Sequence, residues 1–228
     1  MSEPTLSTCW TVIRAAAGGA RDERESFARR YAEPLRAYFA ARWKGGARAQ
    51  EVEDAVQEVF VECYREDGAL AKADPARAGG FRAFLYGIAR NVARRFEERA
   101  ARREGGAADR VELDALPADE ETLSRLFDRA WARSRLAEAA VLQREKAAAA
   151  GAEALRRVEL LRRRFGDDAA IRDIAREWGI DAAELHHEYA RARREFLEAL
   201  RETVRFHEPG ATSGEIARRC EELARLLS

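Results

Sequence analysis

The chain has 228 residues, of which 46% are hydrophobic and 36% charged, and its 41 basic and 41 acidic side chains give a formal net charge of zero. This length allows one large or two small domains, and the balanced charge gives no global sign of nucleic-acid binding. No apolar run reaches the roughly 18 residues of a membrane span, and the N-terminus lacks a secretion-signal pattern, which favours a cytoplasmic protein.

The N-terminal part of the chain is predicted to form helices separated by glycine-containing turns. Helical periodicity runs from about residue 8 to 43, with a break at Gly18-Gly19. A loop with Pro75 and a glycine pair is expected before a long helix over 81–103. The helix over 52–66 carries one apolar stripe with the spacing of a buried helix face: Val52, Ala55, Val56, Val59, Phe60 and Cys63.

Charge is segregated in the middle of the chain. Residues 90–103 carry six arginines and two glutamates, whereas residues 104–121 carry seven acids and Arg110 alone. Two glycines and Pro117 predict a flexible linker over 104–120. Helices resume near Glu121, and Gly151 can divide the following run into two. The predicted fold is therefore all-α, with two small helical domains joined by a flexible acidic linker.

Residues 170–200 have the form of a helix-turn-helix. A short helix ends at Trp178, Gly179 supplies a tight turn, and Asp181 caps the second helix in a capping-box pattern with Glu184. Carboxylates near phosphate repel it, so Glu184 and Glu188 oppose tight binding of duplex DNA. The alternative is a helical corner that binds no ligand. In DNA-binding versions the second helix starts in the major groove, and the candidate contacts are Ala182, Ala183, Glu184, His186, His187, Arg191 and Arg194.

The side chains that carry enzyme chemistry are sparse. Cys9, Cys63 and Cys220 are far apart and form no C-x-x-C pair, which argues against a disulfide framework or structural zinc. Glu184 and His187 have the Glu-x-x-His spacing of di-iron bundles, but such sites need two copies of the pair. With three histidines and no glycine-rich phosphate loop, we expect no enzyme, no metal and no cofactor.

The stretch FRAFLYGIARN (81–91) and the turns after it combine an apolar and a basic face. The apolar face is expected to be core and comprises Phe81, Phe84, Leu85, Ile88, Val92 and Phe96. Arginine binds phosphates, and an aromatic ring or guanidinium plane stacks on an unpaired base, so the other face suits single-stranded nucleic acid. A merely solvated basic face is the alternative. The candidate contacts are Arg82, Tyr86, Arg90, Asn91, Arg94 and Arg95.

Three motifs in this order, DAVQEVFVECY, FRAFLYGIARN and IRDIAREWGI with YARARREFL, resemble a bacterial RNA polymerase sigma factor of the extracytoplasmic-function (ECF) type. The resemblance covers most of residues 8–204. It implies a region 2-like domain at 8–103 for core polymerase and the −10 element and a linker at 104–120. It further implies a region 4-like domain at 121–205, whose helix-turn-helix reads the −35 element, and a helical extension at 206–228.

The resemblance also assigns partners. Helix 81–103 would hold the melted non-template strand, the loop around Pro75 would help to form a pocket for a flipped-out base, and the helix-turn-helix would touch the β flap. The partners implied are core RNA polymerase and promoter DNA, with an anti-sigma protein as a further candidate. Helix 52–66 would dock on the β′ clamp coiled coil through Asp54, Gln57, Glu58 and Val61.

Some features depart from the family pattern or stay open. Many members have Thr and a basic residue where Glu184 and Glu188 stand here. The last helix, with a cap at Thr212 and Glu215, either packs back on the preceding domain or receives a partner. Two other functions stay open: a stand-alone helix-turn-helix regulator that binds duplex DNA, and a helical interaction protein such as a sigma-factor antagonist.

Overall fold

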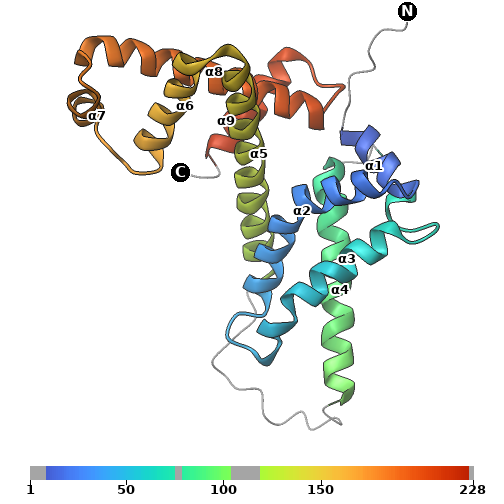
Figure 1. The fold of residues 1–228 in the computed structure, drawn as a ribbon. Coiled ribbons are helices and arrows are strands. Elements are labelled where there is room, and N and C mark those ends of the chain that lie inside the picture. Colours follow the sequence, from blue (N-terminus) through green and yellow to red (C-terminus); the bar gives the residue numbers. More distant parts are fainter. Residues whose placement is uncertain (1–8, 75–78, 104–118, 226–228) are drawn as a thin grey trace, which may run out of the picture. The chain divides into compact units, whose positions relative to one another are not determined.

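The computed structural model describes residues 9–74, 79–103 and 119–225, and the regular secondary structure in these ranges is entirely helical (Figure 1). The predicted all-α fold is confirmed. The predicted loop around Pro75 and most of the predicted linker, 104–118, lie outside the described residues. Within the described ranges, no helix is both long and apolar enough to cross a membrane.

The described residues divide into two compact units, the first ending at Ser134 and the second spanning residues 135–225. The first contains α1 (Cys9–Ala17), α2 (Arg21–Arg42), α3 (Val52–Tyr64), α4 (Gly80–Arg103) and the beginning of α5 (Glu120–Ala150). The predicted break at Gly18-Gly19 is present: Gly19 has φ 92°, a left-handed conformation that favours glycine, and separates α1 from α2.

The first unit is built around an aromatic core. Helix α2 contributes fully buried rings to it. Phe27 packs against Tyr31, with the two ring centroids 4.7 Å apart. The apolar stripe predicted on α3 faces this core, since Ala55, Val56, Val59 and Cys63 are buried and Val52 and Phe60 are partly buried. The predicted apolar face of α4 does the same through Phe81, Leu85, Ile88 and Val92, with Phe84 and Phe96 at its margin.

The first part of α5 completes this core. Leu123 and Phe127 are buried in it, and Trp131 stacks on Tyr31 with ring centroids 5.3 Å apart. Full burial of a large apolar side chain stabilises by about 1.5–3 kcal/mol. The first compact unit therefore extends to Ser134, whereas the sequence predicted that the first domain ends at residue 103 and the second begins at 121.

The second unit contains the rest of α5 together with α6 (Ala152–Phe165), α7 (Ile171–Trp178), α8 (Ala182–His207) and α9 (Ser213–Arg225). Gly151, at φ 108°, ends α5 and divides the run into two helices, one of the two possibilities that the sequence left open. Gly179 turns the chain between α7 and α8 with φ 65°, in the left-handed region. Leu160, Ile174, Ala175 and Leu185 join α6, α7 and α8 in one core cluster.

The last helix packs back on the second unit, as in the first of the two alternatives that the sequence left open. Ile216 and Cys220 of α9 are buried in a cluster with Ala199, Leu200 and Val204 of α8. The predicted capping box is present, because the Thr212 amide donates to the Glu215 carboxylate at 2.8 Å and the Glu215 amide donates to the Thr212 hydroxyl at 3.4 Å.

Candidate nucleic-acid interface

The six residues expected to contact single-stranded DNA lie on α4 in three different environments. Asn91 and Arg94 are exposed, and Arg94 pairs only loosely with Glu98, at 3.6 Å. Arg95 lies toward α3, where its guanidinium approaches Glu62 at 3.3 Å and Glu58 at 4.0 Å. The remaining three, Arg82, Tyr86 and Arg90, contact the first part of α5.

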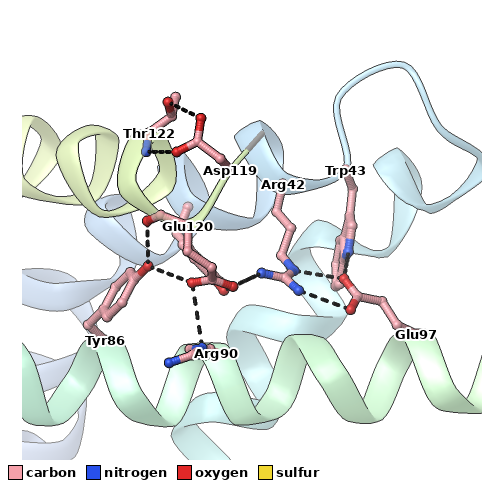
Figure 2. A network of polar contacts seen from close by, with 9 residues as sticks. Arg42, Trp43, Tyr86, Arg90, Glu97, Asp119, Glu120 and Thr122 are labelled. Carbon is pink, nitrogen blue, oxygen red and sulfur yellow. Dashed lines mark hydrogen bonds and ion pairs between the residues drawn. The ribbon is translucent and has the colours of Figure 1, made fainter. Parts of the chain in front are cut away.

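Glu120, the first residue of α5, is the meeting point of several of these contacts (Figure 2). Its carboxylate accepts hydrogen bonds from Arg42 Nη1 at 2.8 Å and from the Tyr86 hydroxyl at 3.1 Å. Arg90 Nε lies 3.5 Å from the same carboxylate. Two turns further along α5, Asp128 pairs with the guanidinium of Arg82.

Arg42, at the end of α2, links this group to a second carboxylate. Its guanidinium donates to Glu97 of α4 through Nε at 2.7 Å and Nη2 at 3.1 Å, and Trp43 Nε1 donates to the same carboxylate at 3.1 Å. The Arg42 side chain is only 16% exposed. Sequence reasoning missed Arg42 because its partners lie 55 and 78 residues away, and no local spacing reports such pairs.

The charges in this group shift the proton equilibria of its members. Burial and the neighbouring Glu120 raise the pKa of Tyr86 to about 12, so its phenol stays a hydrogen-bond donor. Burial alone raises the pKa of Glu120, but hydrogen bonds from Arg42 and Tyr86 outweigh it and lower that pKa below its usual value. Glu97 behaves in the same way, with Arg42 and Trp43 as its donors. Both carboxylates are therefore ionised at neutral pH.

The residues expected to bind polymerase lie on the outer face of α3. Asp54 and Gln57 are exposed, and Val61 is 61% exposed, so an apolar side chain stands among polar ones. Glu58 is half-buried and lies 4.0 Å from Arg95. This pair connects the candidate polymerase surface to the candidate single-strand surface.

The seven residues expected to read duplex DNA are all exposed on α8. Asp181 caps the helix by accepting hydrogen bonds from the amides of Ala183 at 2.9 Å and Glu184 at 3.2 Å. Among the residues that the structure describes, no cluster of three or more His, Cys, Asp or Glu could hold a metal ion, and Glu184 and His187 belong to none.

Glu188, whose charge the sequence left unexplained, has a partner inside the second unit. Its carboxylate lies 3.2 Å from Arg157 Nη1 of α6, and the buried Arg157 also donates through Nε to Glu195 at 2.9 Å. The acid on α8 is thus compensated by an arginine that lies 31 residues away in the sequence. Its negative charge therefore opposes phosphate less than the sequence suggested.

Comparison with protein families places part of the chain. Residues 27–103, from within α2 to the end of α4, match the family model of Sigma-70 region 2. The matched segment is about a third of the chain and lies within the first unit. No curated protein and no solved structure matches the chain.

Proposed function

We propose that the chain is an ECF-type sigma factor that acts with core RNA polymerase in the bacterial cytoplasm. It docks on polymerase through the outer face of α3, recognises the −10 element through α4 and reads the −35 element through α8. The observation that carries the proposal is the position of the Sigma-70 region 2 match, which covers both α3 and α4. The exposed polar residues around Val61 and the basic face around Arg94 therefore belong to one matched domain.

The zero net charge of the chain agrees with this division of labour. A free protein without a strong overall positive charge does not coat DNA through counterion release. When polymerase tethers both units, the second contact becomes intramolecular and its effective concentration rises. Weak individual contacts at two promoter elements then add to specific binding.

Run-off transcription with purified bacterial core polymerase tests the proposal, with the DNA upstream of the protein's own gene as template. A discrete transcript should depend on the protein and should disappear with the double substitution Arg90→Ala/Arg94→Ala. A matched control is Arg102→Ala/Arg103→Ala, which removes the same charge from the last turn of α4. A protein that does not bind core polymerase at all would contradict the assignment.

A stand-alone regulator that binds duplex DNA is the second candidate. The contact between Arg157 and Glu188 favours it, since it compensates an acid that would otherwise weaken duplex binding. An electrophoretic mobility shift without polymerase separates the two functions. The regulator requires tight, sequence-specific duplex binding by the isolated chain, whereas the sigma factor requires polymerase for it.

A further inference from the structure

Three groups from two helices of the first unit converge on the carboxylate of Glu120. Arg42 Nη1, the Tyr86 hydroxyl and Arg90 Nε lie 2.8, 3.1 and 3.5 Å from its oxygens (Figure 2). Two guanidinium groups and a hydroxyl donor around one oxyanion are also the groups that bind phosphate. A carboxylate of the chain itself therefore fills a site whose chemistry suits a nucleic-acid phosphate.

We propose that Arg42, Tyr86 and Arg90 form a phosphate-binding site for single-stranded DNA, which Glu120 occupies in the free protein and leaves when DNA binds. The inference rests on the proposed function, because it names the ligand and the gate of the same α4 face. It adds Arg42, which no sequence motif indicated, and it assigns a role to Glu120, one of the acids of the segment 104–121.

The charges around the site support an exchange of anions. Arg42 and Arg90 are positive and Glu97 and Glu120 are negative, so the group is neutral while Glu120 is in place. When Glu120 moves away, Glu97 still compensates Arg42, and the positive charge of Arg90 on α4 is left without this partner. That charge attracts one phosphate.

The exchange needs only a small movement. Glu120 begins its helix and its side chain is 47% exposed, and helix ends open at little cost. Leu123 and Phe127 anchor α5 in the core one and two turns further on. The first turn of α5 can therefore open while the core of the unit stays closed.

Buried rings of the core hold the Tyr86 side chain in position. The Tyr86 ring lies 5.4 Å from the Tyr38 ring and 5.3 Å from the Phe127 ring, each centroid to centroid, and is partly buried. Its edge and hydroxyl face Glu120. A phosphate in place of the carboxylate keeps the hydrogen bond from this hydroxyl and brings the adjoining nucleotide to Asn91 and Arg94, both exposed on the following turns.

Glu120→Gln tests the inference, and Glu121→Gln is its matched control. Both substitutions remove one negative charge from the first turn of α5, but Glu121 is exposed and pairs only with Arg125 among the contacts described. The probe is a short fluorescein-labelled single strand, and its binding to the full-length chain is followed by anisotropy. Apparent affinity rises by the inverse of the fraction of molecules in which a site is open, so we expect a gain on the order of tenfold for Glu120→Gln and none for Glu121→Gln.

A second substitution tests whether the gain in affinity depends on Arg90. Glu120→Gln combined with Arg90→Ala should lose the increase, and Glu120→Ala alone should reproduce it. Circular dichroism melts verify that each variant is folded. Equal affinity of Glu120→Gln and the unaltered chain overturns the inference, as does an equal gain in Glu121→Gln.

The binding assay and the transcription assay test the two proposals separately, and a negative result in one does not require a negative result in the other. An absent gain in Glu120→Gln, with transcription that still depends on Arg90 and Arg94, overturns the gated phosphate site and leaves the sigma assignment standing. A clear gain in a chain that does not bind core polymerase overturns the sigma assignment. The chain would then be a single-strand-binding protein of another kind.

Discussion

Arg82 of α4 forms an ion pair with Asp128 of α5, 46 residues away in the sequence. Burial raises the pKa of Asp128 although Arg82 acts in the opposite direction, so desolvation outweighs the attraction. A partly exposed pair of this kind contributes little to stability. The pair instead fixes where Arg82 lies, because Asp128 covers its guanidinium. Asn91 and Arg94, further along α4, stay exposed.

The exposed apolar residue of α3 provides a test of polymerase docking. Val61→Asp should weaken binding to core polymerase by at least about tenfold, because a charge within a packed helix contact carries a desolvation cost of a few kcal/mol. Surface plasmon resonance on immobilised core polymerase measures the loss. Val141→Asp is the matched control, since Val141 is 58% exposed on α5 and Val61 is 61% exposed. Equal losses in the two variants would contradict an α3 docking surface.

Arg157 is expected to stabilise the second unit. Arg157→Met keeps most of the volume but leaves Glu188 and Glu195 without their shared partner, and should lower the free energy of unfolding by about 1–3 kcal/mol. The urea midpoint measures this change. Arg162→Met removes an exposed arginine paired with Glu159 and should cost less than about 1 kcal/mol. If Arg162→Met lowers the free energy of unfolding as much as Arg157→Met does, the burial of Arg157 does not explain its contribution to stability.

The cap of α8 makes a separate prediction about stability. Asp181→Ala removes the acceptor for the Ala183 and Glu184 amides and should cost about 1 kcal/mol. Asp181→Asn keeps an acceptor of nearly equal capping strength and should cost only a few tenths of a kcal/mol. Thermal unfolding, followed by the helical circular dichroism signal at about 222 nm, compares the two variants. A loss of similar size in both variants would point to the charge of Asp181 instead of the cap.

Alkaline pH should destabilise the first unit. Burial raises the pKa of Tyr38 from 10.0 to about 12 and that of Cys63 from 9.0 to about 12. The folded chain thus keeps protons that the unfolded chain releases, so these groups contribute their full stability below pH 9.0 and lose it as the pH rises to about 12. For Tyr38 the change is on the order of 2 kcal/mol.

Urea unfolding at a series of pH values, with phenolate absorbance as the second signal, follows this loss. Tyr38→Phe removes one of the titrating groups from the buried core and should flatten the alkaline fall in stability. An alkaline fall of the same size in Tyr38→Phe would show that Tyr38 does not titrate on unfolding. Arg42 donates to the Tyr38 hydroxyl at 3.2 Å, so the variant is compared with the parent at each pH and not at one pH alone.

The sequence by itself determined the helices and the faces that they bury. The breaks at Gly18-Gly19 and Gly179, the cap at Asp181 and the apolar stripe of α3 depend on residues within a few positions of one another. Backbone conformation and helical periodicity are local properties, and a sequence records them directly. The sequence also contained the basic face of α4, as the run of arginines over 90–103.

Only the tertiary structure decided what covers those faces. Periodicity predicted that Tyr86 projects away from the core, but α5 places Glu120 against its hydroxyl and Phe127 against its ring. Arg157 and Glu188 likewise meet only because α6 and α8 pack together. Such partners are 31 to 78 residues apart, and their pairing depends on how helices pack in three dimensions, which no spacing within one helix encodes.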